Sequence, residues 1–266
     1  MRTLTFIVCA LCAGIASLNA RATLTPYNAG GIDLVYSSVS DVTWLQHGNL
    51  LGSWINASGA QAVFDAIADK VPTVTLSYSF SGPEVHTLVL GDYSGAWGAD
   101  GRATFYGAFA FVEYLNAVSY GGINGWRLPD AINTVYPNPF PSGYVKSGDF
   151  GQLYYDELNS TFTGMADPLN YFTDEVHAQY WSFTLFDNTD IVQPYGFHVG
   201  QGDQYFLNKD FPFYVWPVFS GQIAVVPELS SAWLAGPVLL FVAALGRRKG
   251  THISLVHSAE AEPRRD

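Results

Sequence analysis

Cysteine is nearly absent from the sequence. The chain has only Cys9 and Cys12, and both lie in the first 22 residues. These residues resemble a secretory signal peptide: Arg2 gives a positive start, residues 4–15 are apolar, and Ala20-Arg21-Ala22 is a small-x-small cleavage sequence. Cleavage is expected after Ala22, with Ala20 as the alternative. The rest of the chain then has no disulfide and no thiol nucleophile, so a hydrophobic core must stabilise it.

Basic residues are also scarce. Between residues 22 and 226 there are 19 Asp and Glu but only five Lys and Arg, which gives a net charge of −14. Such a surface repels nucleic acid and anionic lipid, so neither is an expected partner of the domain. Aromatic residues are frequent, with 16 Tyr, 18 Phe and 7 Trp in the whole chain. This composition is typical of a folded domain.

Motifs of catalysis are missing. The sequence has no His-Glu-x-x-His zinc motif, no Gly-x-Ser-x-Gly nucleophile elbow, no phosphate-binding glycine loop and no EF-hand. Asp174, Glu175 and His177 would suit an acid–base cluster, but an exposed acidic turn is the preferred interpretation. Asp156 and Glu157 point in different directions on a predicted helix and are interpreted as solvated surface. The chain is therefore predicted not to be an enzyme.

One long apolar run lies near the C-terminus. Residues 229–245 carry no charge, and their 17 positions are at the short end of the roughly 17–25 that cross a bilayer. Arg247, Arg248 and Lys249 follow, which favours a cytoplasmic C-terminal side. A single transmembrane helix with a stop-transfer cluster is predicted, followed by a short, disordered cytoplasmic extension over 250–266.

Val226, Pro227 and Glu228 immediately precede this run. A Val-Pro-Glu motif, one hydrophobic helix and an Arg-rich stop together resemble the PEP-CTERM sorting signal of Gram-negative bacteria that make extracellular polysaccharide. The resemblance implies that an exosortase-type processing enzyme reads the tail and cuts near the motif. Leu229 replaces the family's second proline, and the chain continues for 17 residues beyond the basic cluster. A plain anchor in the inner membrane is therefore the alternative.

The domain between these segments, residues 23–225, begins with strand patterns. Residues 32–36 and 42–45 are short apolar runs separated by a polar turn, which predicts two strands. Residues 73–80 alternate in polarity and are rich in β-forming residues, and residues 85–90 return after a Ser-Gly-Pro-Glu turn. This arrangement predicts a β-hairpin.

Two helices are predicted around this hairpin. The first has Ser58 as its N-cap and places three apolar residues on one face: Val63, Phe64 and Ile67. The second spans 105–118 and has the clearest helical pattern, with an apolar stripe formed by Phe105, Phe109, Val112 and Leu115. Gly121-Gly122 is expected to end it.

A corner is predicted after the second helix. Trp126 and Leu128 flank Arg127, which predicts a buried corner with one satisfied charge, and Pro129 fixes the exit of the chain. A helix that ends in Leu115-Asn116, a Gly-Gly turn and then Trp-Arg-Leu-Pro resembles the Lcl C-terminal domain family, whose own function is not established. The resemblance covers roughly residues 32–224.

Further short motifs match this family in the expected order: Asp41 to Leu45, a second helix over 150–158, Tyr180-Trp181-Ser182, and Tyr214 to Val218. The resemblance implies a C-type lectin-like α+β fold, with two or three helices flanking a small twisted antiparallel sheet with long loops. Phe219 stands where the family has an arginine. The tryptophans of the motifs are assigned to the core: Trp44, Trp126, Trp181 and Trp216.

The last part of the domain is predicted to form a β-meander. Its short strands are separated by Gly and Asp turns and are expected at 180–186, 195–199, 204–207, 211–219 and 222–226. Pro212 and Pro217 predict that the strand 211–219 is an edge strand or contains a bulge. The proline-containing segment 131–147 is predicted to be a surface loop.

Aromatic residues in the predicted loops are the candidate ligand contacts. An exposed ring can stack on the apolar face of a sugar, and the candidates are Trp97, Tyr136, Phe140 and Tyr144. The alternative is that these rings hold the loops onto the core. Carboxylates at Asp187, Asp190 and Asp203 offer oxygen ligands for calcium, although Asp also favours turns for local reasons. No metal or cofactor is predicted, with calcium as the alternative.

These patterns predict four segments: a signal peptide (1–22), an ectodomain (23–225), a sorting tail (226–249) and an extension (250–266). The expected function is that of an exported, non-catalytic surface or extracellular-matrix protein, anchored in the membrane before any processing, that binds exopolysaccharide. The alternatives are a structural matrix protein without a small ligand and, less favoured, an extracellular hydrolase.

Overall fold

The computed structural model of the chain describes residues 24–77, 82–94, 100–131, 143–161, 164–187 and 192–224. These residues form an α+β domain, as predicted. It has four α-helices, where two or three were expected, and its sheets are antiparallel except for one parallel strand pair. Among them, no helix is both long and apolar enough to cross a membrane. The predicted signal peptide, sorting motif, transmembrane helix and C-terminal extension lie outside the described residues.

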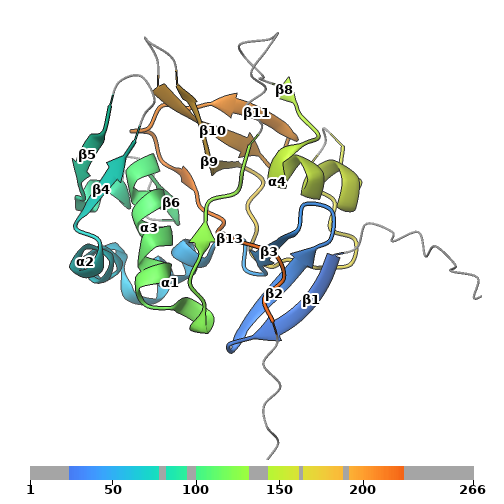
Figure 1. Ribbon diagram of the computed structural model, residues 1–266, viewed down its shortest axis with the longest axis horizontal. Helices are drawn as coiled ribbons and strands as arrows, with labels where there is room; N and C mark the ends of the chain where they lie inside the picture. The colour runs from blue at the N-terminus through green and yellow to red at the C-terminus, as the bar shows by residue number, and fades with distance from the viewer. Residues whose placement is uncertain are drawn as a thin grey trace, which may run out of the picture. The chain divides into compact units, whose positions relative to one another are not determined.

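Three helices gather beside the β4–β5 hairpin (Figure 1): α1 (Leu50–Ser58), α2 (Ala60–Lys70) and α3 (Phe105–Ala117). The first predicted helix, the one with Val63, Phe64 and Ile67 on one face, corresponds to α2. Val63 and Ile67 are buried as expected. Its predicted N-cap is wrong. Ser58 is the last residue of α1, and Gly59, with a φ of 85°, takes the cap position. Glycine adopts this φ without steric cost, so the chain can turn between two consecutive helices.

Helix α3 confirms the clearest sequence pattern. Thr104 is its N-cap, and the Thr104 hydroxyl accepts a hydrogen bond from the amide of Gly107 at 3.1 Å. Phe105, Val112 and Leu115 of the predicted stripe are buried, and Phe109 is partly buried. The predicted hairpin is also confirmed, because β4 (Thr73–Leu76) pairs antiparallel with β5 (Glu84–Thr87).

The other strands form two sheets rather than the single small sheet that was expected. The five-stranded sheet has the order β1 (Leu24–Ala29), β2 (Ile32–Ser37), β3 (Val42–Leu45), β13 (Val218–Ser220) and β7 (Trp126–Arg127). The six-stranded sheet has the order β6 (Arg102–Ala103), β12 (Phe213–Tyr214), β9 (Gln179–Asp187), β10 (Val192–His198), β11 (Asp203–Phe206) and β8 (Gly143–Tyr144). Strands β9, β10 and β11 are the predicted meander.

The predicted strand 211–219 is the main error of topology. It divides into β12, which pairs with β6 and β9, and β13, which pairs with β3 and β7. Both are interior strands, so the predicted edge position is wrong. Pro217 lies where the chain passes from one sheet to the other, and residues 222–224 form no strand. A proline suits this passage because it lacks the amide that a continuing ladder requires.

The core assignment of the four tryptophans is confirmed. Trp44, Trp181 and Trp216 are fully buried, and Trp126 is nearly so. The ring of Trp216 lies 5.2 Å from that of Trp44 on β3 and 5.5 Å from that of Tyr180 on β9, measured between centroids. One side chain therefore contacts both sheets, and aromatic packing holds the two sheets together.

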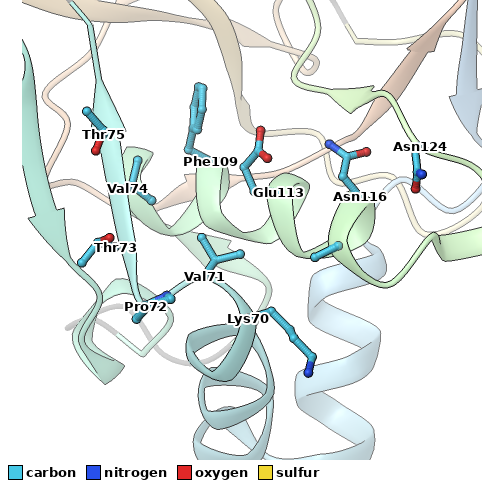
Figure 2. Close-up of a pocket in the computed structure, with 11 residues that line it drawn as sticks. Lys70, Val71, Pro72, Thr73, Val74, Thr75, Phe109, Glu113, Asn116 and Asn124 are labelled. Carbon is cyan, nitrogen blue, oxygen red and sulfur yellow. The ribbon is translucent and has the colours of Figure 1, made fainter.

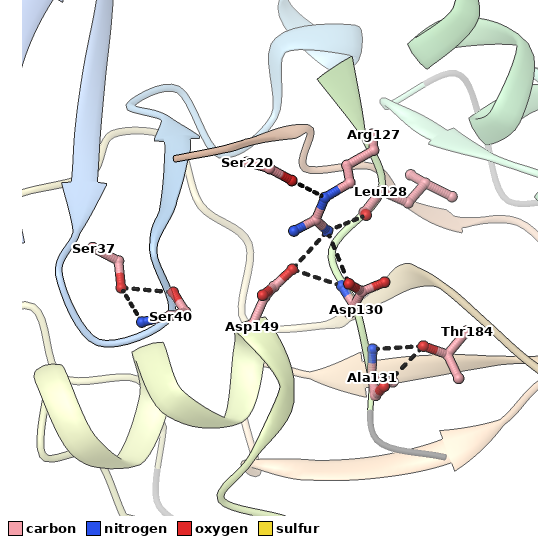
Figure 3. Close-up of polar contacts among 9 residues, drawn as sticks. All are labelled: Ser37, Ser40, Arg127, Leu128, Asp130, Ala131, Asp149, Thr184 and Ser220. Atoms are coloured by element: carbon pink, nitrogen blue, oxygen red, sulfur yellow. Dashed lines mark hydrogen bonds and ion pairs between the residues drawn. The ribbon is translucent and has the colours of Figure 1, made fainter. Parts of the chain in front are cut away.

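The predicted corner at Arg127 is confirmed (Figure 3). Its Nη1 donates to Oδ2 of Asp149 at 2.7 Å and to the carbonyl of Leu128 at 3.0 Å, while its Nε donates to the Ser220 hydroxyl at 2.9 Å. Asp130 lies 3.5 Å from the same Nη1. The charge is thus paired and hydrogen-bonded, which is what a partly buried arginine requires.

The second family-like helix lies near its predicted place. Helix α4 (Gly148–Gly151) continues as the π-helix η3 (Gln152–Glu157). The prediction that Asp156 and Glu157 are both solvated is wrong for Glu157, whose two carboxylate oxygens are buried without a hydrogen bond of ordinary geometry. Burial raises the pKa of Glu157, and the nearby Ser37 hydroxyl and the backbone of Val39 and Ser38 only partly offset this.

Glu157→Gln is therefore expected to stabilise the domain at neutral pH. A carboxyl group with a raised pKa binds its proton more tightly in the folded state, so stability falls as the pH rises from the unfolded value of about 4.3 and stays lower above the folded value. The variant should unfold at a higher temperature than the wild type at pH 7 and at the same temperature near pH 4, as measured by thermal unfolding. Identical curves at both pH values would contradict the prediction.

Candidate functional site

A cleft of about 470 Å³ opens where four strands of the six-stranded sheet begin or end. Arg102 begins β6, Gln179 begins β9, His198 ends β10 and Tyr214 ends β12. Phe213 of β12, with Phe211 and Pro212 just before that strand, completes the lining, and Ala178 lies beside Gln179. The volume lies within the roughly 300–1,000 Å³ that is usual for small-ligand sites.

Aromatic rings form the apolar part of this cleft. Phe211 is 58% exposed, so its ring is accessible to a ligand. Phe213 packs edge-on against Trp181, with 4.9 Å between ring centroids, so its position is fixed by the core. The site thus presents one solvent-facing ring, that of Phe211, and one ring held in place by the core, that of Phe213.

The polar part is held by an ion pair. Nε of Arg102 donates to both carboxylate oxygens of Asp100, at 2.9 and 3.1 Å, and the Tyr214 hydroxyl donates to the same carboxylate at 3.1 Å. Burial alone would raise the pKa of Asp100, but the hydrogen bonds from Arg102 and Tyr214 outweigh it and lower that pKa. The guanidinium of Arg102 also lies 5.8 Å from the centre of the Tyr214 ring. The orientation of Arg102 is therefore fixed.

His198 and Gln179 face each other across β10 and β9. Nδ1 of His198 accepts the amide hydrogen of Gly200 at 3.0 Å. In the neutral ring this hydrogen bond places the proton on Nε2, which makes Nε2 a donor. Gln179 adds an amide that can both donate and accept. The cleft can therefore bind a ligand that has several hydroxyl groups beside an apolar face.

Of the predicted aromatic contacts, Trp97, Tyr136 and Phe140 lie outside the described residues. Tyr144 lies on β8, away from the cleft lining, and its side chain is 67% exposed. Among the predicted carboxylates, Asp190 and the side chain of Asp187 lie outside the description, whereas Asp203 is buried on β11. In the described part of the chain, no group of three or more His, Cys, Asp or Glu side chains could hold a metal ion.

The acid–base cluster considered at Asp174 does not form around His177. Oδ2 of Asp174 instead lies 3.1 Å from Nε2 of His47 in a separate cleft of about 670 Å³. Nδ1 of His47 accepts from the amide of Asn49 at 3.2 Å, so both ring nitrogens are engaged. This histidine is poorly placed to act as a base, and Asp174 itself is exposed, as an acidic turn would have it.

A third cleft, of about 690 Å³, lies between β4 and α3 (Figure 2). Thr73 to Thr75 form one wall of this cleft, and Phe109 lies on the opposite wall. The polar side chains of Lys70, Glu113 and Asn124 are spread along it rather than turned toward one point. The cleft at the ends of the four strands is therefore the strongest candidate, because only there do polar and aromatic groups converge among the described clefts.

The residues of this cleft were not predicted as a site. His198 is not at a metal-ligand spacing from another histidine, and Arg102, Gln179 and Phe211 belong to no motif. The one available signal was Phe211, a large apolar residue directly after the polar turn Asn208-Lys209-Asp210. Comparisons with protein-family models, with curated proteins and with solved structures found no match. Function must therefore be inferred from the site itself.

Proposed function

We propose that the chain is an exported, non-catalytic surface or extracellular-matrix protein whose ectodomain binds exopolysaccharide in the cleft at the ends of β6, β12, β9 and β10. The observation that carries the proposal is the exposed ring of Phe211 beside the fixed polar groups of Arg102, Gln179 and His198. A sugar ring has an apolar face and a polar rim, and this arrangement offers a surface for each.

The charge of the site favours an uncharged polysaccharide. Arg102 is neutralised by Asp100, so the described lining of the cleft has no unpaired positive group with which to attract an acidic polymer. The domain as a whole has a net charge of −14 between residues 22 and 226. Long-range repulsion would therefore slow the approach of a uronic acid polymer, whereas a neutral chain is unaffected.

The absence of acid–base pairs among the described lining residues supports a non-catalytic role over the hydrolase alternative. Glycoside hydrolysis usually employs two carboxyl groups, one of which must be protonated to act as an acid. Asp100 is the nearest carboxylate to Arg102, and its lowered pKa keeps it ionised. It is suited to hold Arg102 in place rather than to donate a proton.

The proposal includes the predicted export route and fold family. Residues 1–22 would direct secretion, and an exosortase-type enzyme would process the tail 226–249 near Val226-Pro227-Glu228. The α+β arrangement is compatible with a C-type lectin-like fold of the Lcl C-terminal type, which is the fold we propose. Fractionation of the host tests the route: separation of the ectodomain from an epitope placed after Lys249 would support processing. Joint retention of both in the inner membrane would identify a plain anchor.

Phe211→Ala is expected to weaken binding of an uncharged polysaccharide about tenfold, since an exposed anchoring ring contributes at least about 1.4 kcal/mol. Affinity electrophoresis or titration calorimetry would measure the loss. Phe183→Ala is the matched control, because Phe183 is also a half-exposed phenylalanine of the domain but does not line the cleft.

Three results would contradict this proposal in different ways. Equal binding by wild type and Phe211→Ala would exclude the cleft as the site. Failure of the wild type to bind any polysaccharide of the host would favour the structural matrix protein without a small ligand. Turnover of a polysaccharide would favour the hydrolase.

A further inference from the structure

Two residues of the cleft begin a row of paired residues that crosses the six-stranded sheet. Gln179 on β9 pairs with His198 on β10, His198 pairs with Asp203 on β11, and Asp203 pairs with Tyr144 on β8. Directly opposed residues of antiparallel strands project from the same side of a sheet. The row therefore leads from two residues of the cleft to the strand at the far edge of the sheet.

Asp203 is the unusual member of this row. Its residue is only 4% exposed, and Oδ2 accepts a hydrogen bond from the Tyr205 hydroxyl at 2.7 Å. Oδ1 is buried and has no hydrogen-bond partner. A buried carboxylate oxygen without a partner is costly, and a donor supplied by a ligand would remove that cost.

Two exposed tyrosines are neighbours of Asp203 on this side of the sheet. Tyr205 lies two residues along the same strand, hence on the same side of the sheet, and is 39% exposed. Tyr144, directly opposite Asp203, is 67% exposed. The hydrogen bond to Asp203 raises the pKa of Tyr205, so its hydroxyl remains protonated and oriented. Two rings and one hydrogen-bond acceptor thus lie together at the edge of the sheet.

The spacing of the row suits a polymer. Neighbouring strands are about 4.8 Å apart, so the three steps from Gln179 to Tyr144 cover roughly 14 Å. This length accommodates several linked sugar rings but exceeds one. Along it, three hydrogen-bonding side chains are followed by the exposed aromatic ring of Tyr144 at the edge of the sheet.

From this arrangement we propose that Tyr144, Asp203 and Tyr205 form a second saccharide subsite, and that the ligand is an uncharged oligosaccharide lying across β9, β10, β11 and β8. The inference rests on the proposed function and deepens it. Oδ1 of Asp203 is covered in the structure, so binding requires the side chains over it to move aside; a sugar hydroxyl then donates to this oxygen while a neighbouring ring stacks on Tyr144. An anionic sugar is excluded by the same carboxylate, because like charges repel at short range.

The test is titration calorimetry of the full-length chain, in a detergent without a sugar head group, against uncharged glucan oligomers of one to six units. Wild-type affinity should rise with oligomer length and then level off. Asp203→Asn and Tyr144→Ala should each weaken binding of the hexamer about tenfold and leave mono- and disaccharide binding unchanged. Phe211→Ala should weaken binding at every length.

A purely structural role of Asp203 would give a different result. Asp203→Asn keeps the acceptor for Tyr205 and removes a buried charge, so a purely structural Asp203 would raise the unfolding temperature and leave hexamer affinity unchanged. That result, or a wild-type affinity independent of length, would overturn the second subsite while the cleft proposal stands. Absence of binding to every oligomer and to the host polysaccharide would overturn both.

Discussion

Replacing Asp92 with alanine is expected to lower the free energy of unfolding by about 3–5 kcal/mol. The residue is 3% exposed, and its carboxylate accepts from the Thr104 hydroxyl at 2.6 Å and from the Val89 amide at 2.9 Å. It also shares a hydrogen bond of 3.0 Å with Nε2 of His86. Alanine would leave these groups without their acceptor, and the Thr104 hydroxyl would lose it in a buried position.

The position of Asp92 in the fold enlarges this effect. It ends the 3₁₀ turn η1 (Leu90–Asp92), His86 belongs to β5, and Thr104 is the N-cap of α3. The Thr104 hydroxyl donates to Asp92 and accepts from Gly107, so Asp92 also orients the cap. One carboxylate therefore joins the hairpin to the start of the central helix.

Urea denaturation would measure the loss, with the midpoint falling and the slope unchanged if unfolding remains two-state. Asp92→Asn retains one acceptor oxygen and should lose less. Asp69→Ala is the control, because Asp69 is exposed and pairs only with its exposed neighbour Lys70, and it should unfold like the wild type. A stable Asp92→Ala protein would show that the three contacts are replaced by solvent.

Elements with a strong local pattern could be predicted from the sequence. Helix α3 carries its apolar stripe at helical spacing, and β2 and β3 are short β-forming runs with a polar turn between them. The buried tryptophans are assigned to the core from the family motifs in which they lie, and their burial agrees with the cost of exposing large rings. For the helix and the two strands, the pattern of apolar residues reports burial directly.

Elements that depend on distant contacts could not be predicted. Helix α1 contains Gly52, a poor helix former, yet that glycine is required: a Cβ atom there would lie 2.6 Å from the backbone oxygen of Asp100. The cleft is a similar case, because Arg102, Gln179 and Phe211 converge only through sheet pairing. The spacing of residues along the chain does not show which strands, distant in the sequence, have their ends at the same place in a sheet.

Trp216→Ala is the second variant with a large expected effect, a loss of about 3–5 kcal/mol of unfolding free energy. The side chain is fully buried, and its ring packs edge-on against Phe172 with 4.9 Å between centroids, in addition to Trp44 and Tyr180. Its Nε1 donates to the carbonyl of Leu45 at 2.8 Å. Alanine would open a cavity at the point where the two sheets meet, and urea denaturation would measure the cost.

A matched pair of substitutions separates packing from hydrogen bonding at this point. Trp44 and Trp216 are both fully buried and in contact, but Nε1 of Trp44 has no hydrogen-bond partner, whereas Nε1 of Trp216 has one. Phenylalanine removes a similar apolar area at either position. Trp216→Phe should therefore cost about 1–3 kcal/mol more than Trp44→Phe, because it leaves the Leu45 carbonyl without this donor and Trp44→Phe removes a group that was already unsatisfied. Equal losses would mean that ring packing alone joins the two sheets.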